Sequence, residues 1–490
     1  MSRRQFLRWA GLVAATPLFL SLEERAAQAI RPRVAAINLE LVTLTETSVI
    51  LTWFTGDPSK GPDSFGRLTP VGADTEVWMG TSSGQLQQVY LDDTKTPYHY
   101  AEITGLEPGQ PYFFVARSNG VPAVPASSAS GSPFGTSVVR VGAAPAAAFT
   151  TPLPPPGTFL FSVALCNDLH LGETVAGLAT TVSGVGVPPG ISQVPGQAPY
   201  PEIMAGALGV EARQRGASVL MAAGDISSEA AQMDVTTAKS YLDAFGTYRS
   251  DYFVTRGNHD RPHNSADAAA CRAVAGADGY HDCFVDSFFP SGPTWYEANV
   301  NGLRIIGLDT YDKPSPSNGG DNGVMGAEQF AWLGERLADD PDIPTFVAGH
   351  HPVTVESDLT TVGKPTMFDL DPQQALQLEA LYAKAPGVFV HHSGHTHRNK
   401  RTTSTTAPNV TFQEVAAVKE YPGGFHLLRV FSGGYAMNFY KFRDADAQAW
   451  SERSRPEYAG TAPQYTFGNA SDRNAVFTRD FSGLRAPVPA

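Results

Sequence analysis

Cysteine is scarce in this chain, with three residues in 490. Three thiols are too few for a structural zinc cluster of the four-cysteine type. Cys166 lies in an apolar, strand-like run and is expected to be a buried thiol. Cys271 and Cys283 flank a loop and either pair as a disulfide outside the cell or stay reduced, and the sequence leaves both possibilities open.

Basic residues are also few, and no basic stripe appears anywhere in the sequence. The formal net charge is −13. This balance argues against a nucleic-acid backbone as the main partner, because such proteins carry clustered lysine and arginine. It is weak evidence against an anionic substrate, since a bound metal ion reverses the local field.

Only the N-terminus holds an extended apolar run, and it is too short to span a bilayer comfortably. The run follows Arg3 and Arg4, contains Pro17 and ends at the small-residue pattern 27–29. It resembles a twin-arginine export signal. We therefore expect residues 1–29 to be a signal peptide read by the twin-arginine machinery. The mature protein would then be secreted or in the cell envelope without a stable membrane span, with an uncleaved anchor as the alternative.

Residues 34–153 contain short runs rich in β-branched and aromatic residues, separated by glycine, proline and polar residues. These runs are 48–54, 75–80, 98–103, 112–117 and 146–151. Such a pattern is typical of a small β-sandwich. Trp53, followed by Leu106, Pro108, Gly109 and Tyr112, resembles a fibronectin type III domain, which precedes the catalytic domain in many purple acid phosphatases. A linker is expected at 154–157.

From residue 158 onward, five short apolar runs each lead directly into a cluster of His, Asp or Asn. The runs are 158–166, 218–223, 252–255, 345–348 and 387–393. Helical patterns lie between several of them, notably at 327–340 and at 371–384, where Asp371 is a suitable N-cap. Alternating strands and helices predict an α/β domain over 158–445. Ligands bind beyond the carboxyl ends of strands in such sheets, so the five clusters are expected to form one site. Residues 446–490 are a polar tail that either packs on the domain or remains loose.

Histidine is scarce too, yet four of the twelve histidines fall within residues 391–397. Histidine supplies neutral nitrogen ligands, and Asp and Asn supply oxygen ligands. The strand ends offer Asp168, His170, Asp225, Asn258, His350, His395 and His397. If the Asp225 carboxylate bridges, these seven side chains give four ligands to each of two metal ions. Mixed oxygen and nitrogen ligation fits Mn, Fe, Zn or Co.

The ordered motifs D-x-H, G-D, G-N-H-D, G-H-x-P and G-H-x-H resemble those of the calcineurin-like metallophosphoesterase superfamily. The resemblance covers about residues 158–445 and implies a four-layer fold, with two packed sheets flanked by helices. It assigns Asp168, His170, Asp225 and His397 to one ion and Asp225, Asn258, His350 and His395 to the other. The match to G-H-x-P favours His350 over His351.

The same resemblance gives His259 a catalytic role, contacting the phosphate and protonating the leaving oxygen, while Asp260 orients its ring. It implies a small phosphomonoester or phosphodiester substrate, attacked in line by a hydroxide that bridges two divalent or trivalent metal ions. Purple acid phosphatases have a tyrosine three residues after the bridging aspartate and glycine in place of the D-x-H histidine. This chain has Ser228 and His170, so its metal site resembles the D-x-H branch, which includes phosphodiesterases.

Two other readings stay open. One is a narrower enzyme of the same superfamily, specific for cyclic nucleotides or glycerophosphodiesters. The other is a cell-surface binding protein whose sandwich does the work beside an inert metal fold. Because all seven ligand positions and His259 are filled, the sequence favours an enzyme. Arg256 and Arg261 flank the catalytic loop and either hold a phosphate oxygen or point into solvent.

Overall fold

The computed structural model describes residues 34–63, 65–125, 139–140, 146–177, 190–262, 271, 283–313, 321–361, 369–457 and 463–486. The expected signal peptide, residues 1–29, lies outside the described residues. No helix in the described part of the chain is long and apolar enough to cross a membrane.

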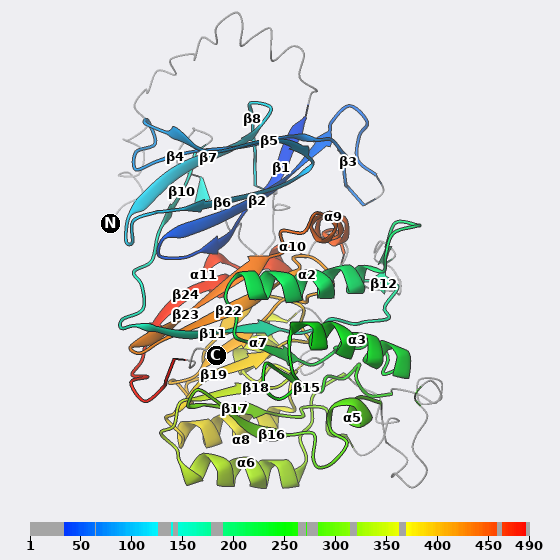
Figure 1. The fold of residues 1–490 in the computed structure, drawn as a ribbon, viewed down its shortest axis with the longest axis vertical. Coiled ribbons are helices and arrows are strands. Elements are labelled where there is room, and N and C mark those ends of the chain that lie inside the picture. Colours follow the sequence, from blue (N-terminus) through cyan, green and yellow to red (C-terminus); the bar gives the residue numbers. More distant parts are fainter. Residues whose placement is uncertain are drawn as a thin grey trace, which may run out of the picture.

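The N-terminal region is a sandwich of two β-sheets, drawn in blue and cyan in Figure 1. One sheet holds β1 (Ala35–Leu44), β2 (Ser48–Asp57), β3 (Thr69–Pro70) and β6 (Tyr98–Thr104). The other holds β4 (Ala73–Gly80), β5 (Gln87–Thr96), β7 (Pro111–Ser118), β8 (Val121–Pro122), β9 (Val139–Arg140) and β10 (Ala147–Thr150). All five predicted strands are present. Buried Trp53 stacks on His99 at 4.8 Å between ring centres, so His99 is a structural residue of the sandwich core.

The larger region contains two six-stranded sheets. The first runs in the order β15 (Tyr252–Thr255), β14 (Val219–Ala223), β11 (Phe159–Cys166), β22 (Gly424–Phe431), β23 (Gly434–Lys441) and β24 (Asn474–Thr478). The second runs β16 (Tyr296–Val300), β17 (Leu303–Gly307), β18 (Thr345–Ala348), β19 (Val388–Ser393), β21 (Thr411–Glu414) and β20 (Lys400–Thr402). Their apolar faces meet in one core that includes Phe161 and Val254 of the first sheet and Phe346 and Val390 of the second. The two sheets therefore form the inner layers.

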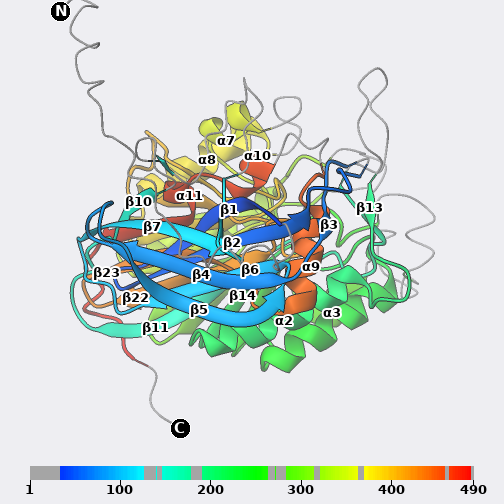
Figure 2. The same ribbon diagram turned by 90° about the horizontal axis from the view of Figure 1, so that it is seen from above.

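Helices cover the outer faces of these sheets. α2 (Tyr200–Gln214), α3 (Gln232–Phe245) and α5 (Cys283–Phe288) lie on the side of the first sheet. α6 (Ala327–Asp339), α7 (Val355–Thr360) and α8 (Pro372–Ala383) belong to the second, and Figure 2 shows α7 and α8 on the side opposite α2 and α3. α8 begins as predicted, because the Asp371 carboxylate accepts from the backbone N–H groups of Gln373 and Gln374. The predicted four-layer fold is confirmed.

The described residues beyond 445, which are 446–457 and 463–486, pack on the larger region rather than remaining loose. It forms α9 (Ala445–Ser454), α10 (Pro463–Phe467), α11 (Ala470–Arg473) and β24, and β24 pairs with β23 as the last strand of the first sheet. Trp450 of α9 is buried and stacks on Tyr200 of α2 with ring centres 4.0 Å apart. The described part of the expected tail therefore belongs to the larger region, whose first sheet continues beyond residue 445.

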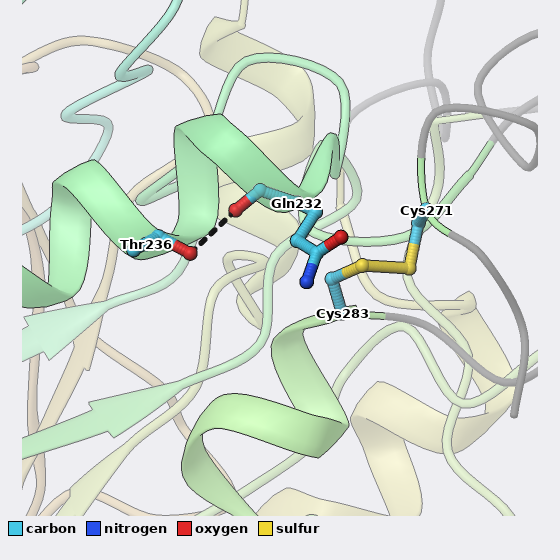
Figure 3. Close-up of a disulfide and its surroundings, with 4 residues drawn as sticks. All are labelled: Gln232, Thr236, Cys271 and Cys283. Atoms are coloured by element: carbon cyan, nitrogen blue, oxygen red, sulfur yellow. Dashed lines mark hydrogen bonds between the residues drawn. A yellow bond between two sulfur atoms is a disulfide. The ribbon is translucent and has the colours of Figure 1, made fainter.

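Cys271 and Cys283 form a disulfide, shown in Figure 3. It lies beside Gln232 at the start of α3, and Cys283 is the first residue of α5. The structure thus resolves the open question of whether these cysteines pair. Cys166, in the middle of the first sheet, is buried and unpaired as expected.

Candidate metal centre

The five strands predicted to end in polar clusters do so in the structure, and all five clusters meet at one edge. β11, β14 and β15 are parallel neighbours in the first sheet, and β18 and β19 are parallel neighbours in the second. Immediately after these strands the backbone turns sharply. Five candidate ligands have positive φ between 46° and 66°: Asp168, His170, Asp225, His395 and His397. This region costs about 1–3 kcal/mol for a non-glycine residue, so its repeated use at one edge marks a functional site.

One group of side chains consists of Asp168, His170 and His397, whose ligand atoms lie within 4.8 Å of one another. Asp168 Oδ1 lies 3.3 Å from His397 Nε2 and 3.8 Å from His170 Nε2. His170 Nε2 also lies 3.5 Å from Asp225 Oδ2. These contacts bring together the four side chains that the sequence analysis assigned to the first ion.

A second group consists of Asp225, His350 and His395, again with ligand atoms within 4.8 Å of one another. His350 Nε2 lies 3.0 Å from Asp225 Oδ2 and 3.1 Å from Asn258 Oδ1. The same Asp225 oxygen faces His170 of the first group and His350 of the second. The carboxylate therefore lies where a ligand shared by two ions has to lie.

The charge balance of this centre fits cations. Asp168 Oδ1 and both ring nitrogens of His170 are buried without a hydrogen-bond partner, although each is a strong ligand atom. Burial by itself would raise the pKa of Asp225, yet the charges of His350 and His259 hold it well below its usual range. Burial likewise opposes protonation of His350, but the Asp225 charge raises its pKa to about 9. The Asp225 carboxylate thus favours a protonated, positively charged imidazole on His350. Metal ions can supply the same positive charge beside the carboxylate.

His350 and His351 are adjacent but have different environments. His350 Nδ1 donates to the carbonyl of Ala223 at 2.8 Å, which leaves Nε2 directed at Asp225. The two ring nitrogens of His351 are instead occupied by the Thr310 hydroxyl at 2.8 Å and the Asp321 carbonyl at 2.9 Å. This geometry supports the choice of His350 as the ligand.

Three of the motifs begin with a glycine that a larger residue could not replace without a steric clash. A Cβ on Gly224 would lie 2.5 Å from the His350 ring, and one on Gly394 would lie 2.6 Å from Asp168 Oδ2. A Cβ on Gly257 would overlap Asp225 Oδ1. These three motifs therefore need a residue without a side chain directly beside a candidate ligand.

We predict that Gly257→Ala displaces Asp225 and weakens metal binding, with about 1–3 kcal/mol lost from stability through overpacking. Mn²⁺ titration and thermal unfolding of the metal-stripped protein measure both effects. Gly209→Ala on α2 is the matched control, because nothing lies within 4 Å of its added Cβ. Equal metal affinity in the two variants would contradict the steric reading of the motif.

His259 lies over the first group, its ring centre 4.6 Å from that of His170. Its Nδ1 donates to the carbonyl of Ser228 at 2.6 Å and lies 3.4 Å from Glu229 Oε1. Its backbone N–H donates to Asp225 Oδ1 at 2.8 Å. Burial would lower the pKa of His259, but the Asp225 charge and the Glu229 contact raise it to about 9. A nitrogen of His259 also falls in a third possible ligand group, with His170 and Asp225.

The expectation that Asp260 orients the His259 ring needs correction. The Asp260 carboxylate accepts from the backbone N–H groups of Gly257 and Ser227, at 3.0 and 2.9 Å, and from the Ser227 hydroxyl at 2.9 Å. These bonds tie the loop after β15 to the loop after β14. Asp260 thus fixes the loop that carries Asn258 and His259, while Ser228 and Glu229 hold the ring.

Arg256 does not face solvent or a substrate. Its guanidinium is buried against Asp309, with Nε 3.0 Å from Oδ2, and forms a structural ion pair. Arg261 is also buried and donates to the carbonyl of Tyr311 at 3.1 Å. Neither of the two interpretations drawn from the sequence applies to Arg256.

The sequence analysis missed the residues that support the ligands from behind. Buried Glu420 accepts from His397 Nδ1 at 2.5 Å, which directs Nε2 towards Asp168. The Asn167 side chain donates to Asp168 Oδ2 and accepts from His392 Nε2 at 3.0 Å. Lys419 pairs with Glu173 at 2.6 Å. Lys419 and Glu420 directly follow the apolar run 415–418. They could have been found by the same pattern as the ligands, which is a polar cluster directly after an apolar run.

Comparison with known proteins gave one family match. Residues 161–399 match the model of the calcineurin-like phosphoesterase family. No curated protein matches the chain.

Among solved structures, a dimetal phosphatase from Danio rerio is similar at 15% identity and TM-score 0.39, covering 57% of this chain and 96% of its own. PhoD is similar at 12% identity and TM-score 0.36, covering 83% and 85%. A purple acid phosphatase from yellow lupin (Lupinus luteus) seeds is similar at 14% identity and TM-score 0.39, covering 93% and 77%.

Proposed function

Because residues 161–399 form a calcineurin-like phosphoesterase domain, we propose that this protein hydrolyses small phosphomonoesters or phosphodiesters at a centre of two metal ions. The observation that carries the proposal is the sharing of Asp225 Oδ2 between two groups of ligand atoms. Asp168, His170 and His397 would hold one ion, and Asn258, His350 and His395 the other, with Asp225 common to both.

Metal ions bound there would polarise the phosphate oxygens and make water acidic enough to react near neutral pH. The protein's own contribution is positioning. The strand ends fix the ligand atoms, and second contacts from Ala223 and Glu420 set which nitrogen of His350 and His397 faces inward. His259, held through Nδ1, can donate a proton from Nε2 to the oxygen of the leaving group.

Export is part of the proposal. The disulfide between Cys271 and Cys283 suits an oxidising compartment outside the cytoplasm. The N-terminal pattern around Arg3 and Arg4 suits the twin-arginine route, which carries folded proteins with their metals in place. We propose that the mature enzyme acts in the cell envelope or the medium.

The test is the rate of hydrolysis of bis(p-nitrophenyl) phosphate against that of p-nitrophenyl phosphate by protein reconstituted with Mn²⁺. Preference for the diester would support the second candidate, a phosphodiesterase, which the histidine at position 170 favours. Preference for the monoester would support a scavenging phosphatase. No hydrolysis of either ester by protein with both sites filled would contradict a broad phosphoesterase.

A further inference from the structure

The segment of residues 418–422 forms one wall of the candidate metal centre. Val418 N–H donates to the carbonyl of Asn167 at 3.1 Å, and Lys419 N–H donates to that of Asp168 at 3.2 Å. Glu420 holds the His397 ring. The segment therefore contacts both the loop after β11 and the loop after β19, and any movement of it shifts two candidate ligands at once.

Helix α9 binds the outer side of this segment. The Trp450 indole donates to the carbonyl of Lys419 at 2.6 Å, and the Ser451 hydroxyl donates to the carbonyl of Pro422 at 2.8 Å. Tyr421 N–H donates to the Ser454 hydroxyl at 2.9 Å. α9 contacts both β6 of the N-terminal sandwich and α2, above which it lies in Figure 1. The segment is thus fixed from the C-terminal part of the chain.

The N-terminal sandwich fixes the same segment. Glu40 of β1 is buried, and its Oε1 accepts from the Tyr421 hydroxyl at 2.5 Å. Arg455 pairs with the same carboxylate, and Lys441 Nζ lies 3.1 Å from its Oε2. Both cations lie over the Tyr421 ring, at 4.6 and 4.9 Å from its centre. Tyr421 therefore connects Glu40 of the sandwich with Glu420, the residue that holds the candidate ligand His397.

We propose that Tyr421 is a positioning residue, through which Glu40 of the sandwich holds residues 418–422 against the metal centre. The proposal rests on the proposed function, since it concerns the support of His397 and Asp168 as metal ligands. It makes the sandwich a structural part of the enzyme rather than a separate binding module. Glu40 and α9 both act on these five residues, next to Glu420, and Arg455 at the end of α9 joins the two anchors through its ion pair with Glu40.

The experiment is Mn²⁺ titration of metal-stripped, full-length protein by calorimetry, comparing wild type with Tyr421→Phe. The variant keeps the ring between Arg455 and Lys441 and removes only the hydroxyl, so the fold is retained. We expect Mn²⁺ affinity to fall about tenfold, as for loss of a partner that supports a ligand. Ser454→Ala, which removes one of the three hydrogen bonds between α9 and the segment, should act in the same direction.

Glu46→Gln is the matched control, because Glu46 also joins the sandwich to the catalytic domain, through Arg429 at 2.7 Å, but does not contact the 418–422 segment. Weaker binding in Tyr421→Phe and Ser454→Ala with unchanged binding in Glu46→Gln supports the proposal. Wild-type affinity in the first two variants, or an equal loss in all three, overturns it. Wild-type protein that binds no Mn²⁺ overturns the proposed function itself and this inference with it.

Discussion

Asp225→Asn is expected to abolish both metal binding and turnover. The substitution keeps the size of the side chain and the oxygen that accepts from His259 N–H, but removes the charge facing His170 and His350. Since the other oxygen, Asp225 Oδ2, lies between the two groups, neither ion would keep its full ligand set. The measurement is metal content after dialysis, together with the steady-state rate on both nitrophenyl esters.

Asp369→Asn is the control for removing a buried carboxyl group. Burial and the Glu414 charge raise the pKa of Asp369 to about 8, so this group is already largely protonated at neutral pH. Its side chain lies outside both ligand groups. We expect this variant to keep its metal and its activity. Full activity in Asp225→Asn would instead remove the basis of the shared site.

The second large effect is expected from His259→Ala, which should lower kcat by about 10²–10⁴-fold while metal content stays at the wild-type level. The ring lies over the first ligand group but is held by Ser228 and Glu229, outside the ligand set inferred from the sequence. Metal content and kcat therefore separate its role from that of Asp225.

Loss of metal in His259→Ala would mean that the third possible group, with His170 and Asp225, is a real ligand set. The assignment of His259 as proton donor would then fail. Normal metal content together with normal kcat on an ester with a poor leaving group, such as an alkyl phosphate, would contradict any role for this ring. An activated ester with a good leaving group should be the least affected substrate, because its leaving oxygen needs no proton.

The sequence predicted the strands and their ends well, because buried parallel strands are continuous apolar runs and the ligands follow them directly. It could not predict which hydrogen bond orients each side chain. Asp260 stands next to His259 in the chain, yet its carboxylate turns back to the amides of Gly257 and Ser227. The orientation of the Asp260 carboxylate depends on the backbone of a second loop. The residues around position 260 in the sequence carry no information about that loop.

The region after residue 445 was harder to predict for another reason. Several of its polar residues are buried through contacts with distant segments. The Arg473 side chain, fully buried, donates to the carbonyls of Val42 in β1 and Phe467 in α10. Polarity in the sequence suggested exposure, whereas the structure satisfies the charge by long-range hydrogen bonding.

The position of β24 also has a consequence for the timing of biosynthesis. β11 is synthesised early, but its partner β22 and the strands β23 and β24 follow only near the end of the chain. At about 5–20 residues per second, the interval between the synthesis of β11 and that of β22 is on the order of tens of seconds. The interval between the synthesis of Glu40, in the first strand, and that of its ion-pair partner Arg455 is longer still. The complete first sheet therefore forms only after translation is almost complete.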